Sequence, residues 1–197
     1  MTTVSTPAEA PPGTLQFLHA PRLRLRLLEK TDVDALTPIF SDDAVTCYLQ
    51  DDSWRSAEDA QTWGEECCAM NAAGKAAWFV CLENATNRII GTCVLFNYDP
   101  LCRRVEIGYT IAREYWKQGF AFEATATLIN HAFTALGLAR IEAVIHVSHA
   151  VSQRVALKLG FTREGLLRNW RLNNKGELHD VVIFSLLKDD ARPSSAS

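Results

Sequence analysis

The stretch from Glu106 to Thr125 constrains the fold more than any other part of the chain. It begins with β-branched and aromatic residues that are typical of a strand, passes through a short turn and continues as a helix. Gly119 and Ala121 lie where that helix should begin. Backbone N–H groups at a helix start have no partner within the helix and lie at the positive end of its dipole. The sequence therefore predicts an anion-binding turn between a strand and a helix.

Alternating apolar residues, turn residues and helix caps predict the elements around this stretch. The sequence predicts strands at 22–28, 77–82, 89–97, 104–111, 141–147, 164–171 and 181–187. It predicts helices at 32–48, with an interruption at Pro38, at 57–72, at 121–136 and in a short segment that ends at Lys158. This order is typical of the α/β (α+β) class, with a mixed sheet and helices on both of its faces.

The composition is that of one globular domain. The chain has 197 residues, of which 48% are hydrophobic and 22% charged, and such a chain is long enough for a single substantial core. Small polar residues with several prolines predict a disordered tail at 1–14, and 189–197 reads as a second tail. We therefore expect the folded domain at 15–188.

Charge and metal-ligand spacing exclude several classes of function. The formal net charge is −3, so no broad positive field is expected to attract nucleic acid or an anionic membrane. No Cys-x-x-Cys pair and no His-Glu-x-x-His motif occurs, so we expect no metal site. Without a disulfide framework, the six cysteines favour reduced thiols and a cytoplasmic location.

Five parts of the chain share one pattern of family resemblance, namely 22–26, 106–109, 116–124, 158–161 and the late Asp180. Taken in order, over roughly 20 to 188, they resemble the GNAT acetyltransferase superfamily. Within that superfamily they are similar to the RimJ/RimL-type branch of ribosomal-protein N-terminal acetylases. It implies the GNAT fold, with a mixed and mostly antiparallel seven-stranded sheet. It also implies an enzyme that transfers an acetyl group from acetyl-CoA to a primary amine, by direct attack in a ternary complex.

The resemblance implies that the predicted anion turn binds the pyrophosphate of coenzyme A. The family's phosphate loop has Gln or Arg, two residues, Gly, one residue, and Gly or Ala. In this chain Trp116 takes the first of these positions, and Gly119 and Ala121 take the last two. In the family two neighbouring strands separate, and the pantetheine arm of the coenzyme pairs with the backbone exposed between them. The resemblance therefore implies such pairing at the end of the strand that finishes at 109–111. The implied coenzyme-binding residues are Tyr109, Ile111, Trp116, Lys117, Gln118, Gly119, Phe120, Ala121 and His149, the last of which replaces a family Asn.

Two residues are candidates for catalysis. Glu106 begins the strand beside the coenzyme site and could take a proton from the amine, directly or through water. The alternative is that Glu106 faces solvent on a half-buried strand. Many superfamily members protonate the departing thiolate with a tyrosine, where this chain has Ala156, and the RimJ/RimL-type branch implies Ser152 instead. The alternative for Ser152 is to cap the helix that follows.

The acceptor depends on loops at 40–75 and 168–180. The expected acceptor is a protein N-terminal α-amine; the alternatives are a small amine, such as an antibiotic, polyamine or amino-acid analogue, and a non-catalytic CoA-binding sensor. The sequence does not distinguish a monomer from a homodimer.

One face of the first predicted strand is basic, and we interpret it as the solvent-exposed face of an edge strand; it carries Arg22, Arg24 and Arg26. Tryptophans could line an acceptor groove or complete the core, namely Trp54, Trp63 and Trp170.

Overall fold

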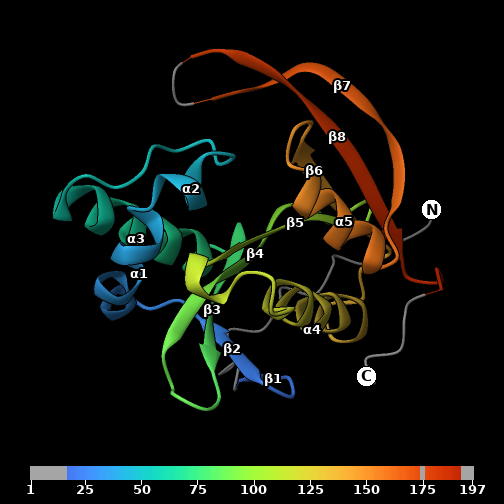
Figure 1. Cartoon of the computed structure of the whole chain (residues 1–197). Coiled ribbons are helices and arrows are strands. Elements are labelled where there is room, and N and C mark those ends of the chain that lie inside the picture. The colour runs from blue at the N-terminus through green and yellow to red at the C-terminus, as the bar shows by residue number, and fades with distance from the viewer. Residues whose placement is uncertain (1–16, 174–175, 192–197) are drawn as a thin grey trace.

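The computed structural model describes residues 17–173 and 176–191 (Figure 1). Eight strands form one sheet in the order β1-β2-β3-β4-β5-β6-β8-β7. The strands are β1 Leu18–His19, β2 Leu23–Leu27, β3 Ala76–Glu83, β4 Ile89–Asp99, β5 Arg104–Ile111, β6 Arg140–His146, β7 Thr162–Leu172 and β8 Leu178–Leu187. The helices are η1 Lys30–Asp32, α1 Val33–Phe40, α2 Asp43–Thr46, α3 Ala57–Ala72, η2 Arg113–Tyr115, α4 Phe120–Thr134 and α5 Ala150–Lys158.

Helices cover both faces of the sheet, and each face has its own apolar core. Strand β3 shows the division, because its side chains alternate between the faces. Phe79 and Cys81 pack in the cluster that contains the apolar side of α4. Val80 and Leu82 pack in the cluster formed with α1 and α3. The predicted mixed sheet between two helical layers is therefore confirmed.

Two details of the elements differ from the sequence prediction. The sheet has an eighth strand, β1, whose two residues are too few to produce an alternating pattern. The expected interruption at Pro38 is also displaced, because α1 continues to Phe40 and α2 begins at Asp43. Asp42 ends the break, and its carboxylate accepts a hydrogen bond from the backbone N–H of Ala44 at 2.9 Å. Its role as the cap of α2 explains the position of the break.

The interpretation of the first long strand as an edge strand with a wet basic face is wrong. Strand β1 pairs with β2 on its outer side. Arg26 donates two hydrogen bonds of 2.7 Å to the carboxylate of Asp32, which is buried. The predicted tail at 1–14 lies outside the described residues, as does most of the one at 189–197, so the domain bounds stay a prediction.

Strands β5 and β6 form the one parallel pair among the described strands, and they separate after three residue pairs. The paired positions are Arg104 with Arg140, Val105 with Ile141, and Glu106 with Glu142. Beyond Glu106, β5 stays paired with β4 as far as Ile111. Strand β6 likewise stays paired with β8 as far as His146. Because each strand stays with its own antiparallel partner, the facing backbone edges of β5 and β6 do not pair with each other beyond this point. We call this separation the opening.

The β7–β8 hairpin extends past the rest of the sheet. Its register shifts between Arg163 and Gly165 and again between Leu167 and Arg171. Such irregularities increase local twist and bend a strand. Figure 1 shows the hairpin arching over the end of the sheet, above α2 in this view. Residues 174 and 175, between the two strands, lie outside the described residues.

Candidate active site

The turn before α4 has the geometry that the sequence predicted for an anion site. Gly119 has φ +84° and forms the N-cap of α4, which begins at Phe120. No side chain among the described residues caps this helix start. A Cβ atom on Gly119 would lie 3.3 Å from Nη2 of Arg22. Glycine therefore supplies both the left-handed backbone and the space beside uncapped N–H groups, which fits a phosphate group.

Side chains around this turn hold it to the end of β5. The indole Nε1 of Trp116 donates a hydrogen bond of 2.7 Å to the carbonyl of Ile111. Gln118 Nε2 donates one of 2.8 Å to the carbonyl of Glu114. Lys117 has φ +61°, which adds a second left-handed residue to the same turn. Trp116, at the position of the family's Gln or Arg, thus ties the strand to the loop.

Phe120 and Ala121, the first two residues of α4, make contacts within the protein. Phe120 is buried and packs edge to face against Tyr115, with ring centroids 5.5 Å apart. The carbonyl of Ala121 accepts a hydrogen bond from Thr125 Oγ1 at 2.7 Å. The structure therefore brings together all the loop residues from Trp116 to Ala121 that the family resemblance assigned to coenzyme binding, and their contacts with coenzyme stay a prediction.

Glu106 lies at the last paired position before β5 and β6 separate, and its side chain is buried. The carboxylate accepts hydrogen bonds from Asn97 Nδ2 at 3.1 Å and from Arg171 Nη2 at 3.2 Å. Burial raises the pKa of Glu106, while Arg171 and Asn97 act in the opposite direction. The alternative of a solvent-facing carboxylate is therefore wrong. A buried carboxylate with a raised pKa suits a general base.

The partners of Glu106 were not found from the sequence. Asn97 has φ +54° and lies at an irregularity of β4 between Phe96 and Asp99. Arg171 comes from β7, on the other side of the opening. A bulge and a long-range contact of 65 residues leave no periodic signal in the chain.

Ser152 and Tyr109 meet on the opposite face of the sheet. Tyr109 Oη donates a hydrogen bond of 3.3 Å to Ser152 Oγ, and Ser152 is buried. Burial raises the pKa of Tyr109, which keeps its phenol protonated at neutral pH. Ser152 is the third residue of α5 and His149 is the N-cap, so the capping alternative for Ser152 is wrong. With its oxygen accepting from Tyr109, the hydroxyl of Ser152 can still donate its own hydrogen.

Glu106 and Ser152 therefore approach the opening between β5 and β6 from opposite sides. Side chains alternate along a strand, so Glu106 and Tyr109, three residues apart, point to different faces. Tyr109 packs against the core that contains α4. A ligand that passes through the opening could meet a carboxylate on one face and a hydroxyl on the other.

His149 belongs to a histidine cluster that the sequence did not predict, made of His146, His149, His179 and Tyr48. The His149 ring stacks on Tyr48, with centroids 4.2 Å apart and planes 17° apart. His146 lies 4.4 Å from His179 between ring centroids. Burial, and to a lesser degree His146, lowers the pKa of His149 to about 4. His149 is therefore neutral at neutral pH, and its predicted contact with coenzyme stays a prediction.

The positions of the three tryptophans distinguish a role in the core from a place in an acceptor groove. Trp54 is buried and stacks on Phe40, with ring centroids 4.7 Å apart. Trp63 packs against Trp54 and Trp78 in the same core. Trp170 is instead exposed on β7, one residue from Arg171. Trp54 and Trp63 thus complete the core, and Trp170 is the one of the three left for contacts outside it.

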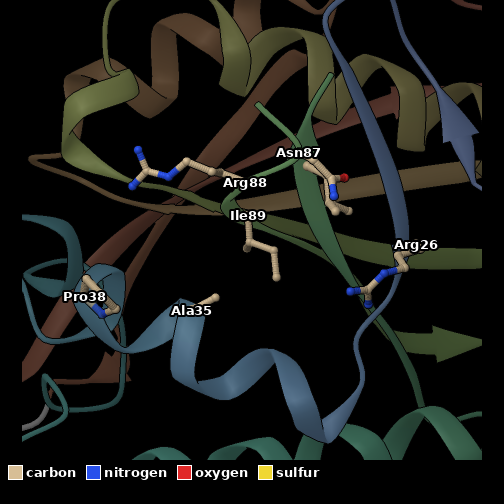
Figure 2. A pocket seen from close by; sticks show the side chains of 7 residues that line it. Arg26, Ala35, Pro38, Asn87, Arg88 and Ile89 are labelled. Carbon is tan, nitrogen blue, oxygen red and sulfur yellow. The ribbon is translucent and has the colours of Figure 1, made fainter. Parts of the chain in front are cut away.

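A cavity of about 430 Å³ lies away from these residues. Figure 2 shows it between α1, which carries Ala35 and Pro38, and Ile89 at the start of β4. Its charged walls are neutralised, since Arg26 pairs with Asp32 and Arg88 lies 3.5 Å from Glu114. None of the predicted catalytic or coenzyme residues lines it. The described residues also contain no cluster able to hold a metal ion and no helix able to span a membrane.

Residues 22–162 match the family model of the Acetyltransferase (GNAT) domain. The chain belongs to the GNAT acetyltransferase family. This GNAT chain is 37% identical to the uncharacterized N-acetyltransferase p20 of Bacillus licheniformis, over 88% of its own length and 97% of that protein. It is 27% identical to the ribosomal-protein-serine acetyltransferase of Escherichia coli, over 69% and 73% of the two chains.

A solved structure of a GNAT acetyltransferase from Bacillus anthracis superposes with a TM-score of 0.78. The sequences are 26% identical, and the match covers 89% of this chain and all of the other. The chain is therefore an acetyltransferase of the GNAT fold, and members of this family take the acetyl group from acetyl-CoA.

Proposed function

We propose that this GNAT enzyme acetylates a protein N-terminal α-amine by direct attack in a ternary complex with acetyl-CoA. The observation that carries the proposal is the opening between β5 and β6, with buried Glu106 on one face and Ser152 on the other. Two substrates that enter from opposite faces would meet there. Such an arrangement needs no covalent enzyme intermediate.

The coenzyme would bind on the α4 side of the opening. The Gly119 turn would hold the pyrophosphate through backbone N–H groups, as its uncapped helix start and open space favour. The free edge of β5 beyond Glu106 would pair with the pantetheine arm. Acetyl-CoA supplies the activated acetyl thioester. His149, at the N-cap of α5, would line the same side.

Glu106 would act as the general base on the amine. A model α-amine has a pKa of about 7.7 to 8.0 and a lysine side chain about 10.4, so an N-terminal amine needs less help to lose its proton. The hydrogen bonds from Asn97 and Arg171 fix the orientation of the carboxylate. Glu106 is the last residue of β5 that pairs with β6, so it would reach an amine beside the opening directly or through a water molecule.

Ser152 would donate a hydrogen bond to the departing sulfur. Tyr109 occupies one acceptor position on its oxygen, which orients the hydroxyl. Ala156, where many superfamily members have a tyrosine, is buried and has no acidic group. Ser152 is thus the polar group on this face that best fits the role.

The pairing of charges favours an N-terminal amine over a polyamine. Glu106 is paired with Arg171, and Glu142 beside it is paired with Arg104 and Arg140. A polyamine with several ammonium groups would need unpaired carboxylates. The name of the Escherichia coli relative, an acetyltransferase for ribosomal-protein serine, points the same way. We also propose a cytoplasmic location.

The test is to incubate the protein with acetyl-CoA and panels of N-terminal peptides and small amines. Release of free thiol is followed by absorbance, and the acetylated product is identified by mass spectrometry. Release that depends on the peptide's first residue supports the proposal. Release with small amines alone would assign the alternative acceptor class, and tight CoA binding without any release would make the protein a sensor.

A further inference from the structure

Arg22, just before β2, contacts both sides of the Gly119 turn. Its backbone N–H donates to Glu123 Oε1 at 2.6 Å, and its Nε donates to Glu123 Oε2 at 2.7 Å. Its Nη1 donates to the carbonyl of Gln118 at 2.9 Å. Gln118 precedes the glycine and Glu123 lies in the first turn of α4. One side chain from a distant strand therefore joins the loop to the helix.

The remaining nitrogen of Arg22, Nη2, lies beside the space that the absent side chain of Gly119 leaves. The guanidinium carbon lies over the Phe120 ring, 4.4 Å from its centroid. Nη2 is the nitrogen 3.3 Å from the place that a Cβ on Gly119 would take. No acceptor among the described residues is paired with Nη2, and the Arg22 side chain is 48% exposed. The contacts of Nε and Nη1 thus leave a fixed N–H donor at the turn.

Arg22 also offsets the negative charge that Glu123 brings to the turn. The side chain of Glu123 is 13% exposed and belongs to the first turn of α4, where no side chain caps the N–H groups. Unpaired, it would repel a phosphate at the same helix start. Its ion pair with the guanidinium of Arg22, 2.7 Å from Nε to Oε2, offsets that charge. The guanidinium has the planar fork that suits both a carboxylate and a phosphate.

We propose that Arg22 is a coenzyme phosphate-binding residue, which orders the Gly119 turn, neutralises Glu123 and offers Nη2 to the pyrophosphate of acetyl-CoA. The inference rests on the proposed coenzyme site and adds to it a residue outside the phosphate loop. Its effect should depend on the phosphates of the acetyl donor and not on the amine.

The experiment compares acetyl-CoA with acetyl-pantetheine, which carries the same thioester without phosphates. Arg22→Gln should raise the KM for acetyl-CoA by about 10-fold or more, since a hydrogen bond to a charged group is lost, with kcat changed little. The KM for acetyl-pantetheine should not change. Arg24→Gln is the matched control, because Arg24 lies on β2 but pairs with Asn84 and Asn87, away from the turn.

Two further variants separate binding from folding. Arg22→Lys keeps the charge without the fork and should give an intermediate KM, and it serves if Arg22→Gln does not fold. Adding Glu123→Gln to Arg22→Gln should restore part of the loss, because the unpaired carboxylate is removed. Equal losses with both donors, or an unchanged KM for acetyl-CoA, would overturn the inference.

Binding measurements keep this inference separable from the proposed function. Calorimetric titration of wild type and Arg22→Gln with CoA tests Arg22 without any acceptor amine. Weaker CoA binding by the variant supports the role of Arg22 even if no tested amine is acetylated. Equal affinities would contradict it, whereas wild-type protein that binds no CoA would contradict the coenzyme site itself.

Discussion

At the scale of single residues, the proposed role of Glu106 as base depends on the environment of its carboxylate. Its carboxylate is buried between an amide from β4 and a guanidinium from β7, so it is held in place without being exposed to bulk water. The sequence identified Glu106 from its position on a strand beside a glycine turn. It could not identify Asn97 or Arg171, because their approach depends on a bulge and on the curvature of a hairpin. The same limit applied to Arg22, whose alternating neighbours made it look like a surface residue.

Replacing Glu106 with Gln should slow acetyl transfer by about 100-fold or more, as loss of a general base commonly does. Catalysis through Glu106 requires its ionised form, so wild-type activity should rise as pH rises through its elevated pKa. In the variant the rise should shift to higher pH, following free amine. The measurement is kcat/KM against pH.

Glu142→Gln is the matched control for this prediction. Glu142 is the register partner of Glu106 on β6, but its carboxylate pairs with Arg104 and Arg140 instead. Its pH profile should keep the wild-type shape, with the rise moved slightly to lower pH, because the charge of Glu142 contributes to the raised pKa of Glu106. A Glu106→Gln profile identical to that of wild type would remove Glu106 as the base.

Replacing His149 with Phe should reduce the loss of stability in acid. The folded pKa of His149 is lowered from 6.5 to about 4, so the unfolded chain takes up the proton first as pH falls. Stability from the neutral ring is present above pH 6.5 and is lost between pH 6.5 and 4. After allowance for partial exposure, the change is about 1–2 kcal/mol. Phe retains the stacking on Tyr48, so urea unfolding of both proteins at pH 7.5 and 4.5 isolates the titration; equal losses would contradict it.

At the scale of elements, the strand–turn–helix unit from β5 to α4 is the part that sequence reasoning predicted best. Its signals are local: a run of strand-forming residues, a glycine with positive φ and a helical repeat. Strand β1 was missed because two residues carry no pattern, and the α1–α2 break was misplaced because Pro38 fits within α1 while Asp42 caps the next helix. A helix or strand is therefore predicted well when the residues that determine it lie within the element itself.

Replacing Gly119 with Ala should weaken coenzyme binding more than it weakens the fold. Alanine at φ +84° is strained by about 1–2 kcal/mol, and its Cβ would press on Arg22 Nη2. We expect a several-fold higher KM for acetyl-CoA together with a lower Tm. Gly137→Ala is the control, because Gly137 has φ +64° and nothing within 4 Å of an added Cβ. It should lower Tm comparably and leave KM unchanged; a raised KM in both variants would show a general effect of stability.

At the scale of the whole molecule, the sheet consists of two antiparallel parts joined by the short β5–β6 pairing. Strands β1 to β5 form one part, and β6, β8 and β7 form the other. The sequence predicted the order of the strands along the chain but not the separation of β5 and β6 in the sheet, which only the family resemblance implied. Register between distant strands depends on pairing partners rather than on local pattern. The separation of β5 and β6 is therefore a property of the assembled sheet, and Glu106 and Ser152 lie on its opposite faces.

The most direct test of this account is a crystal structure of the protein with CoA bound. The account predicts the pyrophosphate against the backbone N–H groups at Gly119 and Phe120, and the pantetheine arm along β5 from 107 to 111. It also predicts the thiol in the β5–β6 opening near Ser152. Coenzyme bound elsewhere, for example in the cavity beside Arg26 and Arg88, with the opening empty, would contradict it.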